Sequence, residues 1–199
     1  VRLDNVSDLV REQLFDVDLE GNDLNVWLLE TARTAISFGH CGVLVDAPKE
    51  GDKTRPYWVT YSPRNILGWR SEIIDGARQL TQLRLLENVV EPDGKYGEKQ
   101  VKQIRVLERG RYEIHRKDKK NSEYKLFDEG EMSLKDKIPF AVAYSNRVGF
   151  YESRSPLYDI AELNLKHYQI QSDLDNILHI SSVPLLAVFG YPNADEITT

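Results

Sequence analysis

The feature that most constrains this chain is a long helical pattern that begins at Ser155. Ser155 offers a side-chain acceptor to the first helical amides, and Pro156 suits the first turn because it lacks an N–H group. No Gly or Pro follows until Pro184, so the pattern predicts a helix of about 25 residues, roughly 40 Å long. After Pro184 the apolar run continues to Tyr191, which predicts a buried strand over residues 183–191.

This predicted helix carries apolar residues on two sides. The first stripe, with alternating spacings of three and four, consists of Ile160, Leu163, His167, Ile170, Leu174, Ile177 and Ser181. The second stripe beside it consists of Leu157, Ala161, Leu165 and Tyr168. A helix of this length with two apolar stripes is typical of a strut between subunits or subdomains. Because no further element follows the predicted strand at 183–191 to cover it, we expect the 199 residues to be part of a longer polypeptide.

Composition places the chain among ordinary globular proteins. Residues are 41% hydrophobic and 29% charged, and we find neither a membrane span nor a secretion signal in the sequence. The single cysteine, Cys41, excludes an internal disulfide and makes a zinc site of Cys and His ligands improbable. The net charge of −6 disfavours tight electrostatic capture of nucleic acid. We expect a reducing, cytosolic origin.

The remaining sequence predicts an α+β fold. N-terminal helices over residues 6–14 and 22–38 precede an apolar strand at 41–48, and later segments alternate in the manner of a largely antiparallel, mixed sheet. The Asp75-Gly76 pair predicts a two-residue hairpin. We predict an α+β domain over residues 1–154, the long helix over 155–182, and a strand with the start of a following region over 183–199.

Three segments carry further predictions. Residues 15–21, FDVDLEG, are expected to be extended, and residues 91–100 are expected to form a turn-rich hydrophilic loop. Residues 117–132 are highly charged, which predicts an exposed hairpin tip, and residues 123–130, EYKLFDEG, are predicted to form a strand of the antiparallel sheet there.

Few residues indicate catalytic chemistry. His40 and Cys41 are adjacent in sequence, so their side chains are expected to point apart, and packing is the preferred interpretation. Asp46 ends an apolar strand, a common position for a metal-binding carboxylate, with Glu72 or Glu108 as possible partners. The alternative is that Asp46 caps a loop. We find no phosphate-binding loop and no hydrolase or metalloprotease motif in the sequence, so we predict no catalytic site, cofactor or metal.

Basic and aromatic residues alternate in the middle of the chain. The basic ones are Arg64, Arg70, Arg78, Arg84, Lys102, Arg105, Arg109 and Arg111, and the aromatic ones are Trp69, Tyr96 and Tyr112. On one sheet face they could form a nucleic-acid platform. Because glutamates lie among them, a solvated or subunit-contacting face is the preferred interpretation.

Several motifs, taken in order, resemble one protein family. They are Gly42 to Pro48, Pro56-Tyr57 with Trp69-Arg70, and the helix with Asn164, His167 and Tyr168 followed by Pro184. Together they resemble tailed-phage and prophage portal-like proteins, a family whose members were long classified as a domain of unknown function. The resemblance covers nearly the whole chain and implies the wing region of a portal subunit followed by the entry to its stem helix.

The resemblance also implies function and partners. Portal subunits form a ring, commonly of twelve copies, at one capsid vertex of the virion, assembled in the cytoplasm of the bacterial host. Double-stranded DNA passes through the ring without sequence-specific readout, and the terminase motor, the capsid and the tail connector bind to it; no membrane is involved. Candidate subunit-contact or channel-facing residues are Asp159, Glu162, His167, Tyr168, Asp173 and Asp175. Two other functions stay open: a metal-dependent phage nuclease or phosphotransferase that uses Asp46, and a cytosolic adaptor.

Overall fold

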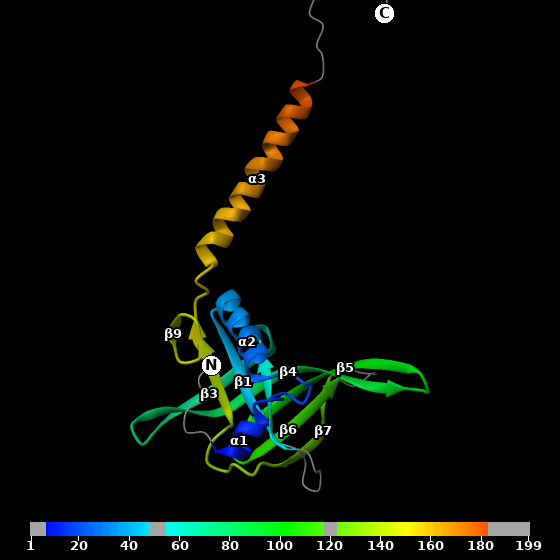
Figure 1. The fold of residues 1–199 in the computed structure, drawn as a ribbon, viewed down its shortest axis with the longest axis vertical. Coiled ribbons are helices and arrows are strands. Elements are labelled where there is room, and N and C mark those ends of the chain that lie inside the picture. The colour runs from blue at the N-terminus through cyan, green and yellow to red at the C-terminus, as the bar shows by residue number, and fades with distance from the viewer. Residues whose placement is uncertain (1–6, 48–54, 118–122, 183–199) are drawn as a thin grey trace, which may run out of the picture. The chain divides into compact units, whose positions relative to one another are not determined.

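The computed structural model of the chain describes residues 7–47, 55–117 and 123–182. The chain divides into two compact units, Val1–Pro156 and Leu157–Thr199, and each unit is described by itself. Every strand among the described residues lies in the first unit, and the described part of the second unit is one helix (Figure 1).

Two helices open the first unit. α1 spans Asp8–Gln13, and α2 spans Leu24–Phe38. The Asp23 carboxylate caps α2 by accepting a hydrogen bond from the Val26 amide at 2.9 Å. Gly39 ends α2 with a φ of 94°. A Cβ atom at Gly39 would also lie 2.9 Å from the backbone carbonyl carbon of Arg154, so two constraints require glycine there.

A three-stranded antiparallel sheet follows α2. Its order is β2-β1-β8, with β1 at His40–Asp46, β2 at Tyr57–Tyr61 and β8 at Phe140–Tyr144. A single-turn 3-10 helix, η1 at Pro63–Asn65, leads from β2 into the second sheet.

The second sheet is a five-stranded antiparallel meander in the order β3-β4-β5-β6-β7. Its strands are β3 (Ile66–Ile74), β4 (Ala77–Asp93), β5 (Gly97–Glu108), β6 (Arg111–Lys117) and β7 (Tyr124–Glu131). Asp75 and Gly76 join β3 to β4 with φ angles of 52° and 74°, as a type I′ turn requires. A short ribbon of β9 (Arg147–Gly149) and β10 (Glu152–Ser153) closes the unit.

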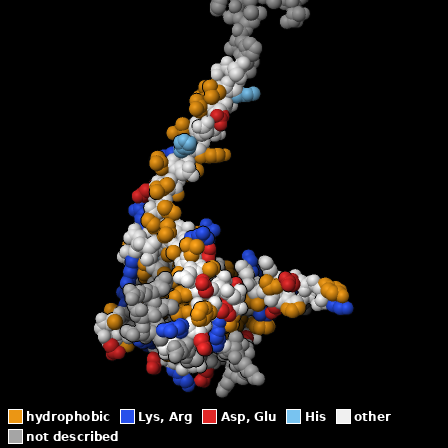
Figure 2. Space-filling model, in the orientation of Figure 1, with side chains coloured by type: hydrophobic (Ala, Val, Ile, Leu, Met, Phe, Trp, Pro, Cys, Tyr) orange, Lys and Arg blue, Asp and Glu red, His pale blue; other side chains and the backbone are white. Residues whose placement is uncertain are grey.

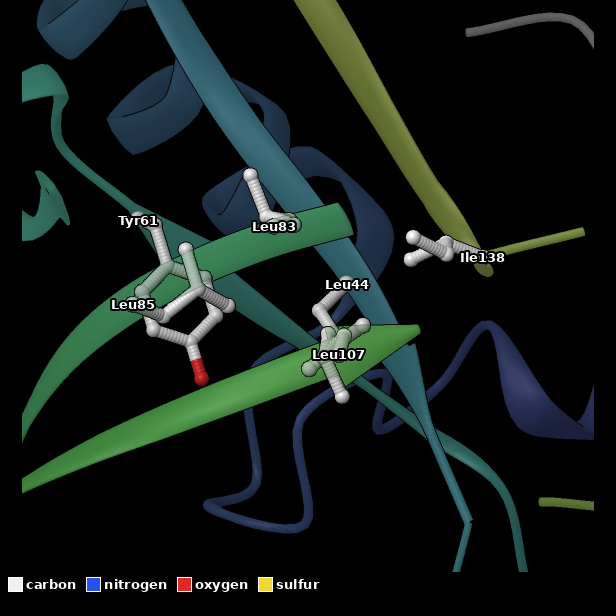
Figure 3. Packing of buried hydrophobic residues seen from close by; sticks show 6 residues of the cluster. All are labelled: Leu44, Tyr61, Leu83, Leu85, Leu107 and Ile138. Atoms are coloured by element: carbon white, nitrogen blue, oxygen red, sulfur yellow. The ribbon is translucent and has the colours of Figure 1, made fainter. Parts of the chain in front are cut away.

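These elements form three layers. α2 packs on one face of the three-stranded sheet, where Trp27 meets Trp58 edge-on with ring centroids 4.9 Å apart. The other face packs on the five-stranded sheet. The core between the sheets consists of Leu44, Tyr61, Leu83, Leu85, Leu107 and Ile138, whose side chains converge in Figure 3.

Removing volume from this core is expected to destabilise the first unit. Leu83 is fully buried, so Leu83→Ala should lower the free energy of unfolding by about 2–5 kcal/mol, because it leaves a cavity. Leu67→Ala is the control, because Leu67 is 48% exposed and should change it by less than about 1 kcal/mol. Urea unfolding followed by tryptophan fluorescence measures both, and equal losses would contradict this assignment of the core.

The structure confirms the predicted α+β class, the α2 helix ending at Gly39, the β1 strand and the hairpin at Asp75-Gly76. The prediction of a mixed sheet was wrong in detail, since each pair of described neighbouring strands is antiparallel. Residues 15–21 are not extended, because the carboxylates of Asp16 and Asp18 accept amide hydrogens from Gly21 and Glu20 and fold the segment into turns.

The predicted loop at 91–100 was also wrong. β4 and β5 continue through it as a ribbon down to the pair Asp93–Gly97, since cross-strand pairing overrides the polar composition. The strand predicted at 123–130 is confirmed as β7, Tyr124–Glu131, and residues 118–122 of the predicted charged tip lie outside the described residues. The strand predicted at 183–191 lies outside them as well.

Candidate subunit-contact helix and buried ion pairs

The second unit is represented by α3, which spans Tyr158–Ser181 in 24 residues. The helix begins three residues later than the sequence predicted, and the residue at its N-cap position is Leu157. The Ser155 hydroxyl donates to the Ile36 carbonyl oxygen at the end of α2, at 2.9 Å. Asp159 lies in the first turn and His179 in the last turn, the positions where an acidic and a basic side chain, respectively, interact favourably with the helix dipole.

Each residue of α3 is exposed, including its large apolar side chains. Along the first stripe, Leu163 is 68% exposed and Ile170 67%; on the second, Tyr168 is 71% exposed. Figure 2 shows hydrophobic side chains along the length of this helix. No helix of the part of the chain that the structure describes combines the length and hydropathy of a membrane span. Contiguous exposed apolar side chains are typical of a surface that contacts another molecule, so α3 is a candidate contact helix on the ground of its exposed stripes.

The candidate residues of α3 occupy different sides of the helix. At about 100° per residue, Glu162, Asp173 and Asp159 fall on one side together with Lys166. Asp175 lies about 160° from Asp173, where its carboxylate accepts a hydrogen bond from Gln171 at 3.1 Å. The four acidic residues therefore do not form one acidic face.

The two aromatic candidates belong to different apolar stripes. His167 lies within the first stripe, and Tyr168 lies within the second. A polar side chain inside an apolar seam can fix the register of two packed helices at some cost in stability.

A second group of polar residues lies between the two sheets of the first unit. The Arg105 guanidinium is 2.6 Å from the Asp46 carboxylate through Nη1 and 2.9 Å from Glu87 through Nε. The Nε contact is close enough for an ion pair, but its angle is too poor for a hydrogen bond. The Tyr61 hydroxyl donates to Glu87 at 2.6 Å, and Gln103 donates to the other oxygen of Glu87 at 2.7 Å.

Burial and charge shift the pKa values in this cluster. Burial opposes the charged form of Arg105, but Glu87 and Asp46 outweigh it and raise the guanidinium pKa. Burial and then the Glu87 charge raise the pKa of Tyr61, and burial and then Asp46 raise the pKa of Tyr57. Arg105 therefore stays charged and both tyrosines stay neutral at ordinary pH.

In this cluster Asp46, the residue on which the nuclease alternative depends, has a structural role. Asp46 accepts hydrogen bonds from Arg105 and from the Tyr57 hydroxyl, the latter at 3.3 Å. Its proposed partner Glu108 binds Gln82 and Arg111 instead. Among the residues that the structure describes, no group of three or more His, Cys, Asp or Glu side chains is placed to hold a metal ion.

Sequence reasoning missed the pairing of Glu87 with Arg105. The signal was present, because Leu83 and Leu85 alternate with outward residues and so place Glu87 on the same buried face. Arg105 had been grouped with a possible nucleic-acid platform. The structure disperses that group: Arg105 lies half-buried between two carboxylates, Trp69 packs against the core, and Tyr96 is 89% exposed at a hairpin tip.

His40 and Cys41 point apart, as their adjacency predicted. The His40 Nδ1 atom is 2.6 Å from the Ser153 hydroxyl, which ties β1 to β10, and burial lowers the His40 pKa. Cys41 is fully buried and its thiol lies 3.6 Å from the Tyr61 carbonyl oxygen.

Burial raises the pKa of Cys41 from 9.0 to about 11, which predicts an unreactive thiol. At pH 8 the folded protein should react with a maleimide at least about 100-fold more slowly than the urea-unfolded protein, from the smaller thiolate fraction alone. Mass spectrometry of timed samples measures the two rates. Equal rates would show that the segment around β1 opens readily.

Comparison with protein-family models matches the last part of the chain. A family model described as a domain of unknown function, DUF4055, matches residues 156–198, the segment that contains α3. No curated protein matches the chain.

Proposed function

We propose that this chain is a structural subunit of a phage portal ring, the oligomeric DNA conduit at one capsid vertex that serves genome packaging and tail attachment. The observation that carries the proposal is α3, a 24-residue helix whose two apolar stripes are both exposed. A ring subunit needs two different complementary surfaces, because closed cyclic symmetry gives each copy two neighbours.

The ordered motifs that resemble portal-like proteins support this proposal. By the same resemblance, the α+β unit corresponds to the wing, and α3 corresponds to the helix that leads toward the stem. The chain is then an assembly component and not an enzyme, with the terminase motor, the capsid and the tail connector as its partners. The net charge of −6 is compatible with DNA that slides past and is not held.

Electron microscopy of the complete gene product, together with native mass measurement, tests the proposal. Closed rings with a central hole, formed at micromolar concentration, are expected. A monomer under all conditions would contradict the proposal and favour the adaptor alternative. DNA cleavage that requires a divalent metal would favour the nuclease alternative, and Asp46→Asn would then abolish it.

A further inference from the structure

The chain leaves the first unit through a short segment that is fastened to the end of α2. This segment, residues 151–155, is called the clasp, and it ends one residue before the end of the unit. The Ser155 hydroxyl donates to the Ile36 carbonyl oxygen at 2.9 Å, and the Ser153 hydroxyl lies 2.6 Å from His40 Nδ1. Two side chains of the clasp therefore hold it against the last turn of α2 and the first residue of β1.

The backbone of the clasp also lies directly against Gly39. A Cβ atom at Gly39 would collide with Ser153 Oγ and would lie 3.0 Å from the Ser155 amide nitrogen. Between the two serines, the Arg154 amide donates to the Asn146 carbonyl oxygen at 3.2 Å. The clasp is thus fastened by its backbone as well as by its side chains.

Tyr151 anchors the start of the clasp. Its φ of 62° is a left-handed conformation that is unfavourable for a residue with a large side chain. The residue is 8% exposed, and its ring centroid lies 5.7 Å from that of Trp69 and 6.0 Å from that of Phe140. Its amide donates to the Tyr144 hydroxyl at 2.9 Å. Strained backbone persists only where surrounding contacts impose it, so these contacts fix the path of the chain at this point.

We propose that the clasp is a coupling device, which holds the chain up to Ser155 so that α3 can change direction relative to the first unit only beyond this residue. The segment between the clasp and the first residue of α3 then consists of residues 156–157. Release of both serines would extend it to residues 152–157, three times the length. A load on α3 is therefore transmitted to the end of α2 and is not absorbed by a linker. This inference does not depend on the proposed function.

Hydrogen exchange of the Arg154 amide tests whether the clasp is closed. In the wild-type protein this amide should exchange at least about 100-fold more slowly than in an unstructured peptide, because it is bonded to Asn146 within a fastened segment. The double variant Ser153→Ala with Ser155→Ala removes both side-chain bonds and should speed the exchange at least about 10-fold. Exchange at the rate of an unstructured peptide in the wild-type protein would overturn the inference.

A matched control replaces two serines outside the clasp. Ser7 and Ser62 occupy N-cap positions, but neither hydroxyl makes a capping hydrogen bond. Ser7→Ala with Ser62→Ala should therefore leave the exchange of the Arg154 amide within about two-fold of the wild type. Equal acceleration in the two double variants would contradict the role given to the clasp serines.

Distances between two spin labels test the consequence for α3. Glu30→Cys on α2 and Asp173→Cys on α3 provide exposed sites, and brief labelling of the folded protein spares the fully buried Cys41. An excess of unlabelled protein isolates the distance within one chain. The span of a flexible segment grows about as the square root of its length, so the variant with both clasp serines replaced should give a distance distribution about 1.7-fold broader.

The remaining outcomes also decide the inference. A distribution of unchanged width, with the Arg154 amide deprotected, would show that the clasp does not control α3 and would overturn it. Should the double variant unfold, as loss of protection at the Leu83 amide would reveal, Ser155→Ala alone provides the comparison. It leaves the His40 contact in place and frees residues 154–157, so a broadening of about 1.4-fold is expected. No broadening in that folded variant would overturn the inference as well.

Discussion

Replacing Ile170 and Leu174 together by aspartate is expected to abolish self-association of the complete gene product. Both side chains lie in the middle of the first stripe of α3, 67% and 46% exposed in the isolated chain. Burying a side chain of this kind contributes about 1.5–3 kcal/mol, so the loss of two weakens each contact by at least about 100-fold. Burying aspartates in their place adds a further desolvation penalty. Sedimentation velocity over a range of concentrations measures the effect.

A matched control keeps the charge and moves it to the polar side of the helix. Gln169→Asp with Asn176→Asp adds the same two carboxylates outside both stripes, so association should stay within a few-fold of the wild type. The first unit should unfold at an unchanged temperature in both variants. If the stripe variant associated as well as this control, α3 would not be the contact helix.

Arg105→Met is expected to destabilise the first unit by roughly 3–5 kcal/mol, because it leaves the Asp46 and Glu87 carboxylates close together without their cation. The Arg105 side chain is 20% exposed and the Glu87 side chain 11%, so water can replace little of the lost interaction. Methionine keeps most of the aliphatic stem, which limits the loss from packing. Urea unfolding followed by the fluorescence of Trp27, Trp58 and Trp69 measures the change.

Two further variants show whether charge causes the loss. Arg111→Met removes an arginine whose side chain is 58% exposed and which pairs with Glu108, so it should change stability by no more than about 1 kcal/mol. The double variant Arg105→Met with Glu87→Gln removes one of the two carboxylates that Arg105→Met leaves unpaired. The amide oxygen of the new Gln side chain can still accept the hydrogen bond from Tyr61, so part of the lost stability should return. Equal losses for Arg105→Met and Arg111→Met would contradict the role given to this cluster.

Local signals predicted the elements whose conformation depends on a few neighbouring residues. Gly39 ends α2 because only a residue that tolerates a φ of 94° can turn there, and Asp75-Gly76 turns the chain between β3 and β4 for the same reason. The absence of Gly and Pro between Tyr158 and Ser181 predicted one unbroken helix, which the structure confirms.

Features that depend on distant residues could not be predicted in this way. The hydrophilic segment at 91–100 forms paired strands because the partner strand satisfies its backbone groups. The Ser155 hydroxyl donates a hydrogen bond to the Ile36 carbonyl, 119 residues earlier, a contact that no local pattern indicates. Arg105 meets Asp46 across 59 residues, and a partner that distant cannot be identified from a local pattern.

The sequence alone determined where α2 and α3 form and which of their residues are apolar, because helical periodicity and chain breakers act over a few residues. The tertiary structure decided which apolar stripes are covered. α2 buries Trp27, Thr31 and Ala35 beside a sheet, whereas α3 buries none of its residues. Burial requires a partner surface, and the position of that surface is set by contacts between segments far apart in the chain.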